Sequence, residues 1–561
     1  MIRGADIVVK SLIAENAEYI FGYPGGAIMP VYDALYDYSD QIKHVLTRHE
    51  QGAIHAAQGY ARVSGNFGVV LATSGPGATN LITGLADAQI DSTPLVCITG
   101  QVAAHLLGTD AFQETDVVGL SMPGTKWNIQ VRSVEEIAPA IAKAFHIAKT
   151  GRPGPVLVDI TKNAQVEFGE FNYVPCQGIR SYRPYVKIDQ KAIDSAAKLI
   201  NTAKKPYVLY GQGVVLAGAE EQLEAFLDKT GIPAASTLLG SGALPQHHPS
   251  YVGKLGMHGN YAPNLLTNQC DVLIAVGMRF DDRVTGDLKR YAKQAKVIHL
   301  ELDPSEIDKN VKCTVAVQGD CKVSLEMLTL AVNSNSHPDW MQKFRDLENE
   351  EKEAVMANDL HGIHGGGLHM GEVIHLINKF KEEDAILVTD VGQHQMIAWR
   401  YFDYKKTRTQ VTSGGLGTMG FALPAALGAQ LYDYKKQVIC VVGDGGIQMT
   451  IQELGTIMQT KAPVKVVLLN NNYLGMVRQW QQLFFDKRYS FTELENPDFI
   501  KIAEAYQIKA RKVTERDDLE ASVAEMILHQ GAYFLEVVVE KEDNVFPMIA
   551  TGCSVEEVRL S

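Results

Sequence analysis

Two mainly apolar stretches of this sequence end in side chains that could hold a divalent cation and a diphosphate. Residues 437–442 run into Asp444, which has glycines on both sides, and residues 464–469 run into three consecutive asparagines. Carboxylate and amide oxygens suit a hard cation, and a phosphate can supply further oxygen ligands. Gly445 and Gly446 would leave backbone N–H groups unshielded at the start of a helix, where a diphosphate is favoured. These residues therefore predict metal-assisted binding of a diphosphate.

The elements around these residues must bring them to one edge of a sheet. Residues 447–460 have helical apolar spacing, so the unit is predicted to be strand, helix, strand with a right-handed parallel crossover. Ligands bind at the carboxyl ends of strands in open parallel sheets, so we expect Asp444 and Asn471 at neighbouring strand ends. Gly-Asp-Gly alone is also an ordinary turn. Asn471 at the next strand end is what favours a metal and diphosphate site.

Another candidate carboxylate is Glu50, in the first turn of a helix predicted to begin near Arg48 and to end near Arg62. The helix dipole alone would favour a negative charge there. The functional interpretation is more specific, because an aminopyrimidine cofactor needs a buried carboxylic acid on a ring nitrogen. That contact shifts the tautomer, so that the exocyclic imine can remove a proton from a thiazolium carbon.

Three glycine-rich segments could let the backbone approach a ligand closely. Residues 73–80 read TSGPGATN, residues 23–26 read YPGG, and Gly211 and Gly213 form a fragment of a dinucleotide fingerprint. Taken alone, each is also explained by a tight turn.

Composition and charge exclude several classes of protein. At 561 residues, with 46% hydrophobic residues, the chain is predicted to form about two to four domains. The net charge of −13, without a basic run, argues against a nucleic-acid partner. Residues 409–432 are uncharged, but five glycines and Pro424 make them a poor membrane helix. We expect a buried loop followed by a packed helix there, and no membrane association.

The cysteines and the N-terminus favour a cytoplasmic protein. Seven cysteines form no CxxC pair and cannot all pair with one another, which suits free thiols in a reducing compartment. The N-terminus enters an amphipathic pattern at once, without the apolar region of a signal peptide.

Short apolar runs alternate with helical segments along the chain, which predicts an α/β protein with three doubly wound domains and mainly parallel sheets. We place these domains at residues 1–165, 188–335 and 368–545, followed by a C-terminal tail at 546–561. Residues 168–187 lack periodicity and resemble a linker. The first and third domains have a similar strand rhythm, which suits two domains of common topology facing one active site.

Nine motifs in order resemble the catalytic large subunit of acetohydroxyacid synthase, in the thiamine diphosphate superfamily. They read YPGG, RHEQGA, SGPGATN, TDAFQE, GRPGPVLVDI, RFDDRVTG, SGGLGTMG, GDGGIQM and NNNYLGMVRQWQ. The resemblance covers nearly the whole chain. It implies a pyrimidine-binding first domain, a central FAD-binding domain and a diphosphate-binding third domain. Thiamine diphosphate would lie between the first domain of one subunit and the third domain of another.

The resemblance also implies roles for the residues of the thiamine diphosphate site. Glu50 would activate the cofactor, and the reaction pocket across the dimer interface would be lined by Gly26, Phe112, Gln113 and Lys162. The diphosphate would be held by Gly392, Gln393, His394, Gln395, Gly445 and Gly446. The Gly417 carbonyl would accept from the aminopyrimidine, and Met419 would support the bent cofactor. Mg²⁺ would be bound by Asp444, the Asn471 side chain and the Tyr473 backbone carbonyl.

FAD and substrate sites follow from the same resemblance. FAD, in a role without net redox chemistry, would contact Gly211, Gly213, Met257, His258, Asp303 and Asp320. Arg283 would offer a bidentate fork to the carboxylate of a 2-keto acid, although an ion pair with Asp281 or Asp282 is the alternative. Trp480, with Met476 and Val477, would form the pocket wall that favours 2-ketobutyrate as second substrate. An isolated tryptophan is more often part of a core.

The implied activity is that of a transferase, acetolactate synthase, in branched-chain amino acid biosynthesis. Pyruvate is decarboxylated, and the hydroxyethyl unit joins a second pyruvate or 2-ketobutyrate to give 2-acetolactate or 2-aceto-2-hydroxybutyrate. The alternatives are a flavin-dependent pyruvate oxidase, a catabolic acetolactate synthase and a non-catalytic cofactor-binding protein. RFDDRVTG and Trp480 favour the synthase over the oxidase. The resemblance implies a homodimer or homotetramer and a small regulatory subunit as partner, and the tail at 546–561 would fold over the active site.

Overall fold

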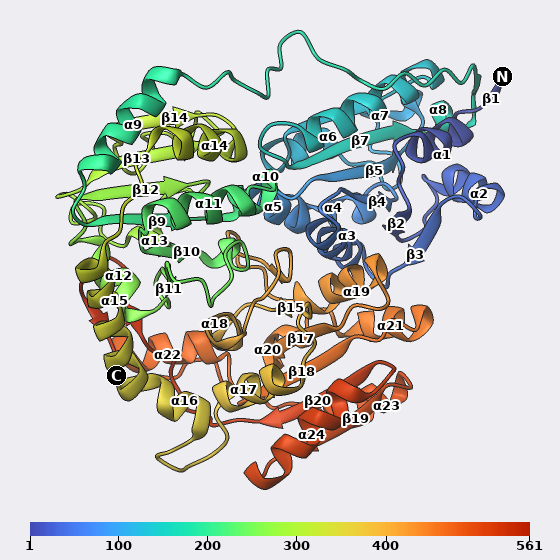
Figure 1. The fold of residues 1–561 in the computed structure, drawn as a ribbon. Coiled ribbons are helices and arrows are strands. Elements are labelled where there is room, and N and C mark those ends of the chain that lie inside the picture. The colour runs from blue at the N-terminus through green and yellow to red at the C-terminus, as the bar shows by residue number, and fades with distance from the viewer.

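Three parallel sheets, one in each third of the chain, organise the structure (Figure 1). The computed structural model describes residues 1–561. Each of these sheets has six strands, and the inner strands are buried along nearly their whole length, whereas most strands at the sheet edges are partly exposed. Helices cover the faces of the sheets, as expected for parallel strands that are apolar on both sides. The predicted α/β class with three doubly wound domains is confirmed.

The first sheet has the strand order β3-β2-β4-β5-β7-β6. Its strands are β2 (Tyr19–Gly22), β3 (Lys43–Leu46), β4 (Gly68–Ala72), β5 (Leu95–Gln101), β6 (Trp127–Val131) and β7 (Pro155–Thr161). The main helices of this unit are α1 (Gly4–Ala14), α2 (Met29–Asp37), α3 (Glu50–Ser64), α5 (Ile82–Ile90), α7 (Val134–Lys149) and α8 (Lys162–Val166).

The third sheet has the order β16-β15-β17-β18-β20-β19, which matches the first strand for strand. Its strands are β15 (Ile386–Thr389), β16 (Gln410–Thr412), β17 (Val438–Gly443), β18 (Lys465–Asn470), β19 (Lys509–Val513) and β20 (Tyr533–Val538). Its main helices are α17 (Met370–Phe380), α18 (Gln393–Tyr401), α19 (Ala422–Tyr432), α21 (Leu454–Thr460), α22 (Gly475–Phe484), α23 (Phe499–Ala505) and α24 (Arg516–Leu528). The predicted common topology of these two units is therefore confirmed.

The central sheet is built differently, in the order β11-β10-β9-β12-β13-β14. Its strands are β9 (Pro206–Tyr210), β10 (Ala234–Ser236), β11 (Tyr251–Lys254), β12 (Val272–Val276), β13 (Lys296–Glu301) and β14 (Val315–Gln318). Its main helices are α9 (Gln190–Thr202), α10 (Gln212–Ala217), α11 (Glu220–Thr230), α12 (Tyr261–Thr267), α13 (Asp282–Thr285), α14 (Cys321–Ala331) and α15 (Pro338–Glu351). An extended segment without long elements leads into α9 across the top of Figure 1, where the sequence predicts a linker.

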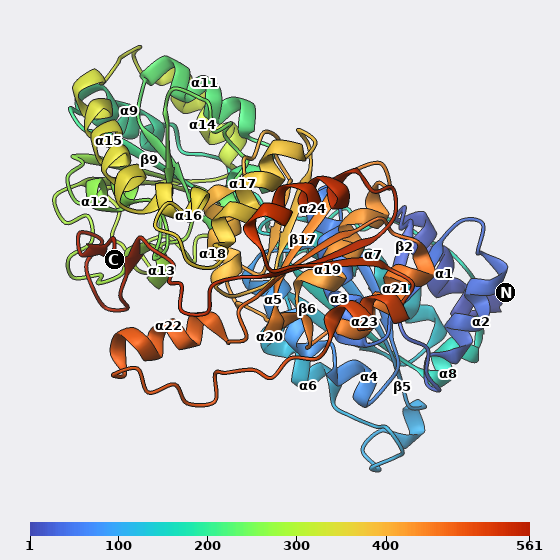
Figure 2. The same ribbon diagram turned by 90° about the horizontal axis from the view of Figure 1, so that it is seen from below.

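The first and third units share a core across helices α3 and α19, which lie side by side in both views (Figures 1 and 2). A Cβ atom on Gly59 would lie 1.9 Å from the Ala425 carbonyl oxygen, and one on Gly428 would lie 1.8 Å from the Ala56 carbonyl oxygen. Only glycine allows two helix backbones to approach this closely. The two units therefore pack directly against each other at this crossing.

The uncharged stretch at 409–432 forms β16, a loop and α19, and residues 422–431 are all buried. The predicted packed helix is therefore confirmed, whereas the loop before it is only partly buried and Leu416 is 45% exposed. No helix combines the length and the apolar character needed to cross a bilayer. All seven cysteines are free.

The C-terminal residues form a short hairpin of β21 (Met548–Ile549) and β22 (Val558–Arg559). The Ile549 backbone N–H donates to the Met257 carbonyl oxygen at 2.9 Å, and the Asp287 N–H donates to the Cys553 carbonyl oxygen at 2.9 Å. The tail thus leaves the third unit and packs on the central one.

Candidate active site

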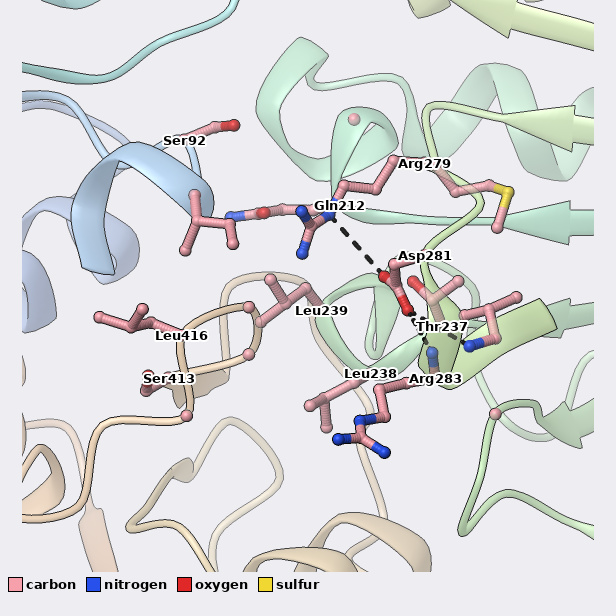
Figure 3. A pocket seen from close by; sticks show the side chains of 18 of the residues that line it. Ser92, Gln212, Thr237, Leu238, Leu239, Arg279, Asp281, Arg283, Ser413 and Leu416 are labelled. Atoms are coloured by element: carbon pink, nitrogen blue, oxygen red, sulfur yellow. Dashed lines mark hydrogen bonds and ion pairs between the residues drawn. The ribbon is translucent and has the colours of Figure 1, made fainter. Parts of the chain in front are cut away.

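A cavity of about 800 Å³ lies where the three units meet, and residues of all three line it (Figure 3). Figure 3 shows Ser92 of the first unit, Gln212 and Arg283 of the central unit, and Leu416 of the third unit around this space. The lining mixes apolar side chains with a few charged groups, as expected for a site that binds an organic ligand.

The central unit contributes the point where its strand order reverses, between β9 and β12. Such a reversal opens a crevice at the carboxyl ends of the strands. Gly211 and Gly213 follow β9, and the Gly213 N–H donates to the Gly277 carbonyl oxygen at 2.8 Å. A Cβ atom on Gly213 would lie 2.6 Å from the Gly277 Cα atom. The glycines are needed for this close approach, and Gly213 itself lines the cavity.

Other predicted FAD residues lie along the same part of the cavity. Met257, His258 and Asp320 line it. Burial lowers the pKa of His258 to about 3, so the ring is neutral, and its Nδ1 atom is buried without a partner. Asp303 is not part of the lining, but its Oδ2 atom accepts from Arg152 Nη1 at 3.2 Å, and Arg152 lines the cavity. A crevice at a reversal point with an unpartnered ring nitrogen fits a dinucleotide.

The third unit contributes the loop before α18. Gly392 has a φ of +153°, and Gln393, His394 and Gln395 form the first turn of the helix. Burial lowers the pKa of His394 to about 3, and its Nε2 atom is buried without a partner. Gly392 and Gln395 line the cavity, together with Gly417 and Met419. A helix start with a neutral, unpartnered imidazole fits a diphosphate.

Asp444 and Asn471 lie at the ends of β17 and β18, which pair in parallel from Ile439 with Lys465 to Gly443 with Leu469. The predicted neighbouring strand ends are confirmed. Burial raises the pKa of Asp444 to about 6, and both side chains are buried. The Tyr473 N–H donates to Asn471 Oδ1 at 3.1 Å.

The donors available near Asp444 suit one particular kind of metal site. The chain contains no group of three or more His, Cys, Asp or Glu residues that could hold a metal ion. A cation at Asp444 would therefore depend on one carboxylate, amide and carbonyl oxygens and oxygens of a ligand, which is the pattern of Mg²⁺ bound through a phosphate. Gly445 and Gly446 follow in α20 (Asp444–Ile447), beside these donors.

Glu50 lies in a second group of residues, at the carboxyl edge of the first sheet. Its side chain is 8% exposed, and its Oε2 atom accepts from Asn80 Nδ2 at 2.9 Å. A Cβ atom on Gly77 would lie 3.1 Å from Glu50 Oε1, and one on Gly75 would lie 2.8 Å from the Gln113 carbonyl oxygen. The glycine-rich turns thus pack directly against the carboxylate.

The remaining residues predicted for this pocket lie on the open side of the same edge. Phe112 is 87% exposed, Lys162 is exposed at the start of α8, and the space around Gly26 is open. None of these residues, nor Glu50 or Gln113, lines the cavity described above. Asp444, Asn471 and Tyr473 do not line it either, so within one chain neither the Glu50 group nor these proposed cation ligands belong to the cavity lining.

The four residues predicted to contact substrate all line the cavity: Arg283, Met476, Val477 and Trp480. Arg283 is more than half exposed and lies 3.6 Å from an exposed Asp282 carboxylate. Ion pairs of this kind contribute little, so the guanidinium stays available to a ligand. The Asp281 carboxylate instead accepts from the backbone N–H groups of Arg283 and Val284. Trp480 packs on Phe484 with ring centroids 4.9 Å apart and faces the cavity rather than the core.

Comparison with known proteins identifies the family. The chain matches three models in order: the N-terminal TPP binding domain of thiamine pyrophosphate enzymes at residues 2–120, the central domain at 193–328 and the C-terminal TPP binding domain at 390–537. It is 46% identical over 558 residues to the acetolactate synthase isozyme 2 large subunit of Escherichia coli, covering 99% of both chains. The chain belongs to the acetolactate synthase family of thiamine pyrophosphate enzymes.

Other members of the acetolactate synthase family match over a similar length. The acetolactate synthase large subunit of Corynebacterium glutamicum is 44% identical, over all of this chain and 90% of its own. The isozyme 3 large subunit of Escherichia coli is 42% identical, over all of this chain and 99% of its own. These matches do not favour the alternative of a pyruvate oxidase.

Three residues that support this acetolactate synthase site were not found from the sequence. Asn496 Nδ2 donates to Asp444 Oδ2 at 2.7 Å. Asp390 accepts from the Val391, Gly420 and Ala422 N–H groups and so joins the two cavity loops. Gln479 accepts from Gln393 at 2.9 Å. Asp390 directly follows a buried strand, and this position could have marked it as a candidate in the sequence. Nothing in the local sequence marks Asn496 or Gln479 in this way.

Proposed function

We propose that this chain is the catalytic large subunit of an acetolactate synthase. It decarboxylates pyruvate and joins the hydroxyethyl unit to a second pyruvate or to 2-ketobutyrate, as one step in the synthesis of branched-chain amino acids. The observation that carries the proposal is the pair of half-sites. One holds a buried carboxylate beside a glycine-rich turn. The other holds a diphosphate loop that lines the cavity with Arg283 and Trp480, and the cation ligands at the ends of β17 and β18.

We assign the cofactors to residues as follows. Thiamine diphosphate would be held by Gly392, Gln393, His394, Gln395, Gly417, Met419, Gly445 and Gly446, and Mg²⁺ by Asp444, Asn471 and the Tyr473 carbonyl oxygen. FAD would occupy the crevice at Gly211, Gly213, Met257, His258 and Asp320, with Asp303 acting beside it. Thiamine diphosphate, when bound, supplies the electron sink for decarboxylation.

The positions of the site residues suggest a separate role for each of them. Glu50 would hold a proton at its carboxyl oxygen and exchange it with a ring nitrogen of the cofactor, while Asn80 keeps the carboxylate oriented by its 2.9 Å hydrogen bond. Arg283 would bind the carboxylate of the acceptor 2-keto acid through its planar fork. Trp480 and Val477 would exclude water from one wall of the pocket.

We further propose that the working unit is a homodimer, with a homotetramer as the larger possibility. The Glu50 group does not line the cavity of its own chain, and its rim carries the exposed apolar side chains of Phe112, Leu120 and Met122. A second subunit would cover this rim and bring its own Asp444 group to Glu50. A small regulatory subunit would be a further partner. The free cysteines favour a cytoplasmic location, because disulfides are rare in that compartment.

Mixing two inactive variants tests whether the site is shared. In dimers assembled at random from Glu50→Gln and Asp444→Ala subunits, half are mixed, and each mixed dimer has one intact site of two. Activity is therefore expected to return to about a quarter of the wild-type value, because a two-fold dimer contains two equivalent sites. Initial rates after co-refolding or co-expression measure it. Sites contained within one chain would give no recovery.

The proposal includes limits for the three domains and the tail. We assign residues 1–165 to the pyrimidine-binding domain, 188–335 to the FAD-binding domain, 368–545 to the diphosphate-binding domain and 546–561 to the tail. Separate expression of these segments, followed by limited proteolysis, tests the limits.

Trp480 is expected to set the choice of second substrate. Trp480→Leu enlarges the pocket wall, and one methylene of substrate is worth about 1 to 3 kcal/mol of discrimination in an apolar pocket. The ratio of 2-aceto-2-hydroxybutyrate to 2-acetolactate should fall by about tenfold in a competition between pyruvate and 2-ketobutyrate. Phe484→Leu, at the other face of the stacked pair, is the matched control. An unchanged product ratio in Trp480→Leu would remove this residue from the pocket.

One assay tests the proposed function as a whole. Purified protein is incubated with pyruvate, thiamine diphosphate and Mg²⁺, with and without FAD, and acetolactate, oxygen uptake and acetyl phosphate are measured. Acetolactate in large excess over oxygen uptake supports the synthase. Stoichiometric oxygen uptake with little acetolactate would make the protein an oxidase.

A further inference from the structure

Gln479 lies in α22 beside the cavity wall, but its own side chain points into the protein and is fully buried. Its Oε1 atom accepts from Gln393 Nε2 at 2.9 Å and from the Val545 N–H at 2.9 Å. Its Nε2 atom donates to the Val545 carbonyl oxygen at 3.1 Å. The amide thus joins the diphosphate loop to the segment that leads into the C-terminal tail.

The backbone of Val545 allows only one orientation of the Gln479 amide. A backbone N–H can only donate and a carbonyl oxygen can only accept, so Oε1 must face the Val545 N–H and Nε2 must face its carbonyl. If the amide were reversed, Oε1 would face the Val545 carbonyl oxygen and Nε2 would face the Val545 N–H. Neither pair could form a hydrogen bond, and the buried groups left unpaired would destabilise the fold. Val545 therefore determines which atom Gln479 presents to Gln393.

Gln393 in turn determines the orientation of Asn471, the proposed cation ligand. Its Nε2 atom donates to Gln479 Oε1 and to the Asp543 carbonyl oxygen at 2.8 Å, so its Oε1 atom is left to face Asn471. The Asn471 Nδ2 group donates to this oxygen at 3.3 Å. Asn471 Oδ1 is then turned away from Gln393 and accepts from the Tyr473 N–H at 3.1 Å, and its second lone pair is the kind of donor that a cation needs.

The same segment continues to the substrate residues. Arg478, the neighbour of Gln479, is also fully buried, and its Nη2 atom donates to the Asp543 carbonyl oxygen at 2.7 Å. Beyond it, the Ile549 N–H donates to the Met257 carbonyl oxygen, and Thr551 Oγ1 lies 3.5 Å from Arg283 Nη1. Residues 543–551 therefore run from the two buried side chains of α22 to the wall of the cavity.

We propose that Gln479 is a positioning residue that orients the cation ligand Asn471 through Gln393 and couples cation binding to residues 543–549. Gln479 does not line the cavity, and it acts through two successive amides. The inference rests on the proposed function, because it takes Asp444 and Asn471 as the cation site.

Gln479→Leu tests the proposal, since leucine is similar in size but can neither accept nor donate. Mg²⁺ is titrated into wild-type and variant protein at saturating thiamine diphosphate, and binding is followed by calorimetry. We expect Mg²⁺ to bind at least about tenfold more weakly, the usual effect of losing a partner that orients a metal ligand. Hydrogen exchange of residues 543–549 is measured with and without Mg²⁺ and thiamine diphosphate. Binding should protect these amides in the wild-type protein and not in the variant.

Two further variants separate positioning from a general structural role. Gln481→Leu removes another amide of α22, one that bonds to Ser490 and Thr492 instead, and should leave both measurements unchanged. Gln479→Glu keeps an acceptor for Gln393 and loses the donor to Val545. It should bind Mg²⁺ within about threefold of the wild-type affinity, because the acceptor that orients Gln393 remains, but lose the ligand-dependent protection. This variant carries the test if Gln479→Leu does not fold.

The outcomes distinguish the two proposals. Equal Mg²⁺ affinity in the wild-type protein and in Gln479→Leu would overturn the positioning role and leave the function standing. Wild-type protein that binds neither Mg²⁺ nor thiamine diphosphate would overturn both.

Discussion

Replacing Glu50 with glutamine is expected to leave thiamine diphosphate bound and to remove most acetolactate formation. Glutamine fits the same buried space beside Asn80, but it cannot exchange a proton with a ring nitrogen. Loss of a positioned acid or base typically lowers a rate by about 10² to 10⁴, so we expect an effect of this size on acetolactate formation. Initial rates at saturating pyruvate measure it, and calorimetry measures the dissociation constant of thiamine diphosphate.

A matched variant separates this effect from the loss of a helix-terminal charge. Glu135 lies in the first turn of α7, as Glu50 does in α3, but it is exposed. Glu135→Gln removes the same charge from the same kind of position and should retain the wild-type rate. If Glu50→Gln also retained a near-normal rate, Glu50 would be only a helix-terminal charge, and its assignment would be wrong.

Replacing Asp444 with alanine is expected to remove both the cation and the diphosphate from the third unit. The side chain is the only carboxylate among the proposed ligands, and its burial leaves no room for solvent to replace it. Loss of an orienting partner alone costs about 10- to 100-fold in metal affinity, and loss of a ligand should exceed this. Calorimetric titration of Mg²⁺ at saturating thiamine diphosphate measures the change, and activity should be lost in parallel.

Two variants test whether this loss is specific. Asp433 lies before the other end of the same strand, and Asp433→Ala removes a carboxylate there without touching the proposed ligands. It should bind Mg²⁺ as the wild-type protein does. Asp444→Asn keeps one oxygen for the cation but no charge, and we expect an intermediate affinity. Asp444→Ala protein with undiminished Mg²⁺ binding would place the cation elsewhere.

The sequence by itself was enough to predict the layout of the fold. Strands buried on both faces leave nearly continuous apolar runs, so residues 437–442 and 464–469 could be recognised without knowledge of their neighbours. Local chemistry also marked Asp444 and Asn471, because each directly follows such a run. The similar strand rhythm of the first and third units also predicted their common topology, although the same alternation in the central unit forms a different strand order.

Only the tertiary structure decided which of these residues meet. Asn496 reaches Asp444, and Gln479 reaches Gln393 and Val545, because loops far apart in the sequence pack together. The separation of Glu50 from the cavity likewise depends on how α3 crosses α19 at Gly59 and Gly428. Periodicity and motif spacing describe short-range order, whereas these contacts depend on packing between units. For that reason, the sequence indicated the chemistry of the two half-sites, and only the structure showed that neither Glu50 nor Asp444 lines the cavity between the three units.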